Sequence, residues 1–296
     1  MVNQIFLQIV TGLQLGAIYV LIALGLTLIF GTLGVVNFTH GALFMLGAFS
    51  AVIISGNYGF VAAIIIVPPF LFFFGVLMER FIVRFFYDRP HTDQILVTFG
   101  FAIVIQETLK WIFGSNNIPF KMPAWGRGIL KLHEYVPFLD GFVAYPKWRF
   151  ILITVSFFTV IALFALLQFT RFGMVIRAGM NDSEILSFLG INITRRFTLV
   201  FGLGSMIAGL AGVFAGPVTN VDPGLGMFYL VPSFLVVVIG GMGSLPGAVL
   251  ASFLLGMAQS FTVSFAGLQA IVVYIVAVVV LLFMPRGLLG KKGVLD

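Results

Sequence analysis

The residues of this sequence that could do chemistry are few, and they lie inside or beside long apolar runs. Asn37, Thr39 and His40 directly precede one apolar run, and Thr98 and Gln106 lie within another. Amide, hydroxyl and imidazole groups in such surroundings hydrogen-bond to neighbouring segments or to a polar solute. We therefore take these five residues as candidates for a solute path. In the alternative, Asn37 and His40 cap a helix at the surface of the protein.

A second informative stretch is the charged segment 171–196. Asn181 or Asp182 is suited to cap a short helix there, and Glu184 would lie favourably in its first turn. An apolar face follows, and Gly190 suits the end of the helix; the face consists of Ile185, Leu186, Phe188 and Leu189. This order predicts a short amphipathic helix, which either docks into a soluble partner or lies passively in lipid headgroups.

Several kinds of chemistry are excluded. The chain has no cysteine, so disulfides, thiolate zinc sites and a cysteine nucleophile are ruled out. His40, His91 and His133 are scattered, and we expect no metal site. The sequence contains neither a G-x-x-x-x-G-K-[ST] phosphate loop nor an H-E-x-x-H motif. We therefore expect no enzyme and no cofactor in this chain.

Composition places the chain in a membrane. Of its 296 residues, 60% are hydrophobic and only 9% are charged, whereas soluble domains are about half apolar and about a quarter charged. One soluble core cannot absorb this much apolar surface, so lipid must solvate part of it. The net charge of +6 comes from lysines and arginines that lie mostly in loops, with no basic cluster among exposed aromatic residues. This pattern argues against nucleic-acid binding.

Apolar runs bounded by charges, glycines or prolines predict the elements that position these residues. We expect an all-α polytopic membrane protein, a single domain over 1–296, with about eight or nine transmembrane or partly re-entrant helices. The predicted segments are 5–30, 38–54, 60–86, 94–113, 150–169, 197–216, 227–239, 248–265 and 269–284. Segment 227–239 is too short for a comfortable span, and 114–147 is the one long polar connection.

The distribution of lysine and arginine predicts the orientation. One side carries the larger set: Arg80, Arg84, Arg89, Arg171, Arg177, Arg195, Arg196, Arg286, Lys291 and Lys292. The opposite side carries Lys110, Lys121, Arg127, Lys131, Lys147 and Arg149. We therefore expect the 171–196 loop and the C-terminus in the cytoplasm, and loop 114–147 outside.

The loop 171–196 also carries a family resemblance. Arg177-Ala178, then acidic residues, then Leu189-Gly190-Ile191-Asn192 resembles the coupling loop of ABC importer permeases, in particular the branched-chain amino acid (Liv-type) permeases. Four further motifs resemble that family in the expected order. They are Asn-Phe-Thr-His-Gly at 37–41, Thr-Phe-Gly at 98–100 with Gln106, the glycine-rich 239–247, and Pro-Arg-Gly-Leu at 285–288. Thr39 stands where alanine is usual in the family.

The resemblance implies a multi-pass permease subunit of the bacterial inner membrane, which forms the path for branched-chain or similar small amino acids. It implies two separate ATPase subunits, which bind ATP and Mg²⁺, a periplasmic substrate-binding protein, and a second, identical or related permease subunit. The coupling-loop residues that would meet the ATPase are Arg177, Asp182, Glu184, Ile185, Phe188, Leu189 and Gly190.

Three alternatives remain at this point. A related permease could carry another small solute such as urea. A secondary transporter would prefer a buried carboxylate or a proton relay within the helices, and Glu107 is the only carboxylate well inside an apolar run. A membrane-embedded enzyme would need clustered histidines or carboxylates, which the sequence lacks.

Overall fold

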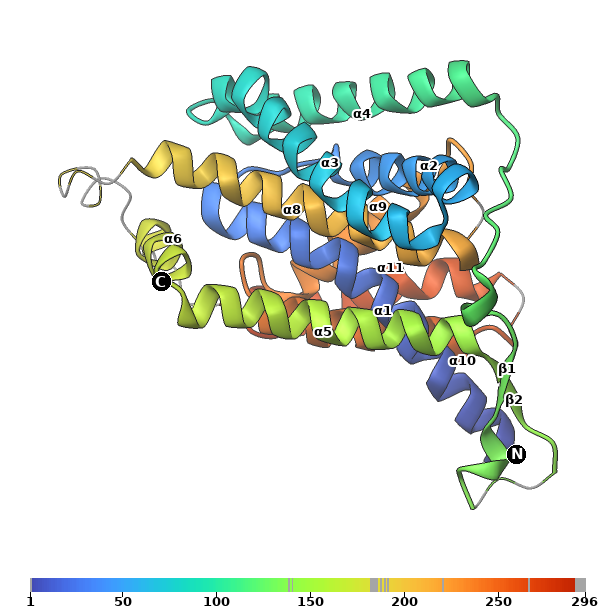
Figure 1. The fold of residues 1–296 in the computed structure, drawn as a ribbon. Coiled ribbons are helices and arrows are strands. Elements are labelled where there is room, and N and C mark those ends of the chain that lie inside the picture. Colours follow the sequence, from blue (N-terminus) through green and yellow to red (C-terminus); the bar gives the residue numbers. More distant parts are fainter. Residues whose placement is uncertain are drawn as a thin grey trace.

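The chain folds into a bundle of helices that mostly run between the same two ends (Figure 1). The structure, a computed structural model, describes residues 2–290 apart from 138, 140, 182–185, 187, 189, 191, 220 and 266. Six helices of this part are long and apolar enough to cross a membrane: α1 (Val2–Leu33), α2 (His40–Tyr58), α3 (Phe60–Phe81), α4 (His91–Phe113), α5 (Lys147–Phe169) and α8 (Ile193–Ala215).

Three shorter apolar helices complete the bundle: α9 (Leu225–Gly240), α10 (Leu245–Phe261) and α11 (Leu268–Phe283). Every apolar segment predicted from the sequence forms a helix, which confirms the all-α polytopic fold. The segment expected to be short, α9, has 16 residues, or roughly 24 Å of helix. That length is less than the roughly 30 Å hydrocarbon core of a membrane.

The two ends of the bundle differ. At the α6 end, α6 (Arg171–Asn181) turns across the ends of the long helices (Figure 1). The hairpin end holds the start of α1, the 3₁₀ turns η2 (Ala124–Gly126) and η3 (Leu132–Glu134), and the antiparallel strands β1 (Ile129–Lys131) and β2 (Ala144–Pro146). A further 3₁₀ turn, η1 (Val83–Phe86), follows α3, and η4 (Gly216–Val218) follows α8.

The connection 114–147 is packed onto the hairpin end. Its Ile118 pairs as a β-bridge with Val221, in the connection between α8 and α9. Trp148, fully buried at the start of α5, donates a hydrogen bond from Nε1 to the Phe214 carbonyl at 2.9 Å. The loop is therefore a fixed surface over the helices rather than a free tether.

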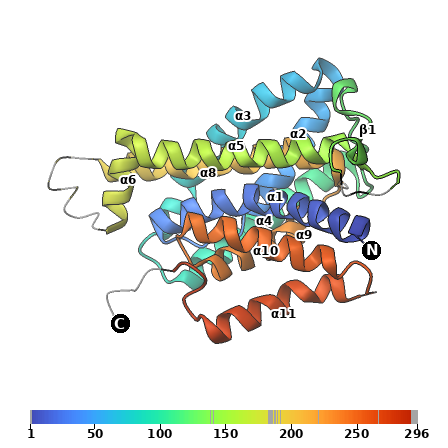
Figure 2. The same ribbon diagram turned by 90° about the horizontal axis from the view of Figure 1, so that it is seen from below.

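Helix α1 is the centre of the bundle. Figure 2 shows it between α5 on one side and α10 on the other, and it also contacts α8 and α9. Its residues from Ala17 to Ile29 are buried on every face, as expected for a helix that is apolar all round. Helices α4 and α5 lie at the periphery and expose most of their apolar surface.

Glycines bring the central helices into backbone contact. A methyl group added to Gly212 of α8 would lie 2.5 Å from both the Phe44 carbonyl oxygen and the Ala48 amide nitrogen of α2. A methyl on Gly204 of α8 would lie 2.9 Å from the carbonyl oxygen of Gly25 in α1. Such close approach compensates for the hydrophobic driving force that is missing between helices in lipid.

Two of the sequence motifs meet in space at the α6 end. Leu288 N donates to the Ile239 carbonyl at 2.7 Å, and Leu289 N donates to the Gly240 carbonyl at 3.1 Å. Gly241 has a φ of +97° at this contact, a left-handed conformation that favours glycine. The end of the Pro-Arg-Gly-Leu motif and the residue after it are therefore hydrogen-bonded to the glycine-rich turn between α9 and α10.

The charged segment 171–196 differs from the prediction at its start. Residues 171–181 form α6, which was not predicted, and Asn181 is its last residue rather than the cap of a following helix. The physical reason is an apolar stripe at helical spacing, Phe172, Val175, Ile176 and Gly179, of which Ile176 and Gly179 are fully buried. The flanking arginines obscured this stripe in the sequence.

The glycine contacts lead to a stability prediction. Gly212→Ala should destabilise the fold by about 1–3 kcal/mol, because the backbone atoms that its new methyl meets cannot rotate away. The matched control is Gly100→Ala on α4, where a methyl meets nothing within 4 Å. Thermal unfolding in detergent checks this, and an equal melting temperature for both variants would contradict it.

Candidate solute path and coupling segment

The first candidate site is an interruption of helix deep in the bundle, at residues 34–39 between α1 and α2. Asn37, Thr39, His40 and Thr98 are each at most 1% exposed. Thr98 lies seven residues into α4 from its start at the α6 end, or roughly 10 Å along the helix. The break therefore lies within the bundle rather than at its surface.

Side chains from both sides of this break satisfy its backbone, and we call Asn37, Thr39 and Thr98 the polar joint. Phe38 N donates to Thr98 Oγ1 at 3.1 Å, and Thr39 Oγ1 donates to the Thr98 carbonyl at 2.6 Å. Thr39 N donates to Asn37 Oδ1 at 3.0 Å. Non-helical backbone at membrane depth is tolerated only where protein or water satisfies it. Four of the five residues selected from the sequence thus come together here.

Three nitrogen atoms beside the joint make no hydrogen bond within the described part of the chain. They are Nδ1 and Nε2 of His40 and Nδ2 of Asn37, all buried. The His40 ring packs against the bare face of Gly25, where an added methyl would lie 2.8 Å from Nε2. A polar solute or a water molecule that reached the joint would give these nitrogens partners, and leaving them unpartnered costs free energy.

Gln106, the fifth candidate, does not belong to the joint. It is partly buried and lies two turns further along α4 than Thr98, a distance of roughly 12 Å. Next to it, Glu107 and Lys110 form an ion pair at 3.4 Å with side chains 55% and 46% exposed. The exposure of this pair places Glu107 at the surface of the chain rather than in its interior.

The second candidate site is the coupling segment 171–196. Ile176 of α6 is fully buried against residues of α1, α5 and α8, which anchors the segment in the bundle. Arg177 follows on α6, and its Nη1 is buried without a partner among the described residues. Phe188 is 82% exposed and Gly190 has a φ of +74°. Asp182, Glu184, Ile185 and Leu189 lie outside the described residues.

A charged cluster that sequence analysis did not single out lies near this segment. Glu79, at the end of α3, is fully buried, and Arg84 donates to both of its oxygens, from Nε at 3.2 Å and from Nη2 at 2.9 Å. Tyr87 Oη donates to Glu79 Oε1 at 2.7 Å. Arg84 Nη2 also donates to Thr198 Oγ1 of α8 at 2.6 Å. We call these four residues the α3–α8 latch.

The Tyr87 hydroxyl of the latch keeps its proton over the ordinary pH range. Burial, together with the hydrogen bond to the Glu79 carboxylate, raises the pKa of Tyr87 far above its usual value, so its hydroxyl stays protonated and donates. The hydrogen bond to Glu79 also raises the pKa of Arg84. The spacing of Glu79 and Arg84 was visible in the sequence, but the partner Thr198 is distant in the chain and gave no signal.

Comparison with known proteins assigns the family. The family described as "Branched-chain amino acid transport system / permease component" matches residues 8–285. The chain belongs to this family. Its members are transport permease components, so the chain is a permease rather than an enzyme, and the ATPase partners are separate chains.

Individual relatives agree with that assignment. The permease is 28% identical to the high-affinity branched-chain amino acid transport system permease protein LivH of Escherichia coli (strain K12), over 97% of this chain and 96% of the relative. It is 30% identical to the corresponding permease protein BraD of Pseudomonas aeruginosa, with the same coverage. A fructose import permease protein, FrcC of Rhizobium meliloti, matches at 30% identity over only 36% of this chain and 31% of the relative. No solved structure matches the permease.

The polar joint leads to a second prediction. Thr98→Val removes the hydroxyl that accepts from Phe38 N and leaves that amide unpaired, which should cost about 1–3 kcal/mol of unfolding free energy. Thr98→Ser should retain stability. Thr108→Val, an exposed α4 site whose hydroxyl bonds only within its own helix, is the control. Thermal melts of the three variants in detergent test this prediction. An unchanged melting temperature for Thr98→Val would show that the joint does not contribute to stability.

The α3–α8 latch leads to a third prediction. Arg84→Ala leaves the buried Glu79 carboxylate without a counter-charge, which should lower the free energy of unfolding by about 3 kcal/mol. Adding Glu79→Gln to that variant should recover part of the loss, because no unpaired charge remains. Arg80→Ala, an exposed arginine next to Glu79, should be close to neutral. Melting temperatures measure all three, and equal losses for the Arg80 and Arg84 variants would refute the latch.

Proposed function

We propose that this permease is a subunit of an ATP-driven ABC importer and forms, with a second permease subunit, the path for branched-chain or similar small amino acids. The observation that carries the proposal is the match to branched-chain amino acid permeases over 97% of the chain. The fold adds support, because it supplies both an anchored coupling segment and a break in helix inside the bundle.

The partners follow from this proposal. Two ATPase subunits, which hold ATP and Mg²⁺, would dock on the coupling segment 171–196, and a periplasmic binding protein would deliver the solute at the hairpin end. Ile176 and the α3–α8 latch offer a route for movement. Ile176 ties the coupling segment to α1, α5 and α8, and the latch joins α8, which follows that segment, to the end of α3. The coupling roles of Asp182, Glu184, Ile185 and Leu189 are part of this proposal.

The orientation is proposed on the distribution of charge. Eight arginines of the described residues lie toward the α6 end: Arg80, Arg84, Arg89, Arg171, Arg177, Arg195, Arg196 and Arg286. The hairpin end carries six basic residues: Lys110, Lys121, Arg127, Lys131, Lys147 and Arg149. By the positive-inside rule, the α6 end and the C-terminus face the cytoplasm of a bacterial inner membrane. The hairpin end then faces the periplasm.

The polar joint is the proposed inner part of the solute path. Its three unpartnered nitrogens, on Asn37 and His40, are hydrogen-bonding groups that the fold itself leaves unused. Thr98 accepts a hydrogen bond from the non-helical backbone of the break, and we assign Gln106 to the path nearer the hairpin end. An ion-driven mechanism has less support, because the buried carboxylate of Glu79 is already paired with Arg84 and Tyr87.

The test is uptake into proteoliposomes that hold the complete complex, with ATP inside and binding protein plus labelled leucine outside. We expect uptake that requires both ATP and the binding protein. Uptake without ATP would refute the proposed ATP-driven importer and favour an ion-driven carrier. ATP-dependent uptake of another solute such as urea, without leucine uptake, would support the ATP-driven importer and refute the proposed substrate.

A fourth prediction concerns docking of the ATPase. Phe188→Ala should reduce copurification of the ATPase subunits and ATP-dependent uptake by about tenfold, because an 82% exposed aromatic side chain is a typical interface anchor. Phe85→Ala, also exposed and at the same end of the bundle, is the control and should change neither. Unchanged copurification of the Phe188 variant would place the ATPase contact elsewhere.

A further inference from the structure

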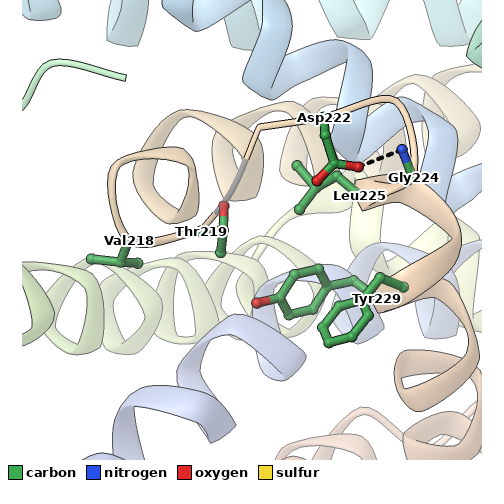
Figure 3. Close-up of a pocket in the computed structure, with 7 residues that line it drawn as sticks. Val218, Thr219, Asp222, Gly224, Leu225 and Tyr229 are labelled. Carbon is green, nitrogen blue, oxygen red and sulfur yellow. Dashed lines mark hydrogen bonds between the residues drawn. The ribbon is translucent and has the colours of Figure 1, made fainter. Parts of the chain in front are cut away.

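A cavity of about 470 Å³ lies at the hairpin end, between the end of α8 and the start of α9 (Figure 3). Its walls combine three polar side chains, Thr219, Asp222 and Tyr229, with apolar surface from Val218, Leu225 and Phe228. The volume falls within the range of small-molecule sites, roughly 300–1,000 Å³. Polar and apolar groups share this wall almost equally, and small-molecule sites use placed polar groups to fix the orientation of what they bind.

Asp222 gives the cavity a negative charge that no described lysine or arginine pairs with. Its Oδ1 accepts from Gly224 N at 2.7 Å, which closes a turn at Asp222-Pro223-Gly224. Glu107 and Glu134 at this end of the bundle are each paired with a lysine. Asp222 forms no ion pair with any described residue. A carboxylate without a counter-charge in a partly enclosed site attracts a cationic group such as an ammonium.

Tyr229 provides a hydroxyl directed into the same space. Only 8% of the residue is exposed, and its ring is held against Phe44, Tyr19 and Phe228. Its oxygen points into the cavity in Figure 3 and forms no hydrogen bond within the described part of the chain. The Oγ1 of Thr219 lacks a partner among the described residues as well, but it is buried and not open to the cavity. The free Tyr229 hydroxyl is suited to donate to a carboxylate.

We propose that this cavity binds the zwitterionic head of an apolar α-amino acid as it enters the permease. Asp222 takes the ammonium group, the hydroxyl of Tyr229 takes the carboxylate, and Leu225 and Phe228 face the aliphatic side chain. The inference rests on the proposed function, and it adds the site at which the solute is first held. Tyr229 also contacts Tyr19 of the central α1, so the cavity adjoins the core of the bundle.

Because the chain has no cysteine, a single introduced thiol reports on the cavity. We would label a Val218→Cys variant with a maleimide in the complete complex without the binding protein, and quantify the label on this chain. Leucine should slow labelling, whereas 4-methylpentanoate, which lacks the ammonium group, should not. The control is Ile129→Cys, exposed at the same end but outside the cavity, which should label equally with and without leucine.

We would next combine Asp222→Asn with Val218→Cys. The asparagine keeps an oxygen that can accept from Gly224 N and removes only the charge. It should raise the leucine concentration for half-protection by about tenfold or more, the loss expected for a hydrogen bond to a charged group. Asp88→Asn, an exposed carboxylate at the opposite end, should leave protection unchanged. Tyr229→Phe should weaken protection, and Tyr274→Phe on α11 should not.

The outcomes separate this inference from the function beneath it. ATP-dependent leucine uptake by the complex, without protection of the Val218→Cys thiol at any leucine concentration, overturns the cavity and leaves the importer intact. Loss of binding-protein capture in the Asp222→Asn variant, with leucine protection retained, makes Asp222 a docking residue and also overturns the site. Absence of leucine uptake by the unaltered complex refutes the proposed substrate itself.

Discussion

Every backbone amide in a lipid-surrounded bundle needs a partner, and the break at residues 34–39 is where this requirement is hardest to meet. Thr98 of α4 contributes two oxygen atoms here. Its Oγ1 accepts from Phe38 N, and its carbonyl oxygen accepts from Thr39 Oγ1. The consequence reaches well beyond the joint. The peripheral helix α4 is tied to the interior by this contact, and α2 can start inside the bundle rather than at its surface.

Close packing around α1 is the second condition for the fold. Glycines of α1, α8 and α10 remove side chains where helices meet, so the central backbones touch. Because the backbones of the central helices touch, little room is left between them for a wide channel in the described part of this chain. Unpaired buried polar atoms of the described residues include those at the joint between α1 and α2 and the Thr219 hydroxyl beside the cavity where α8 gives way to α9. At both places a long helix ends and non-helical backbone follows.

The sequence predicted much of this arrangement. Long apolar runs marked every spanning helix, and Asn37, Thr39, His40 and Thr98 were chosen as one group because polar residues are costly in such runs. Gln106 was chosen with Thr98 as a polar residue inside the same apolar run, and the α-helical rise separates it from the joint. The Glu79–Arg84–Thr198 contact escaped prediction because it depends on how α3 and α8 are packed. Helix α6 escaped because its arginines mask a narrow apolar stripe.

The contact between the segment after α11 and the glycine-rich turn bears on how the last three helices are held together. Leu288 N and Leu289 N donate to the carbonyls of Ile239 and Gly240 at the end of α9. The last carbonyls of a helix have no partner within that helix, and leaving them unpaired in a buried place costs free energy. The chain that leaves α11 therefore completes the end of α9, so α9, α10 and α11 cannot separate at this end of the bundle without losing these two bonds.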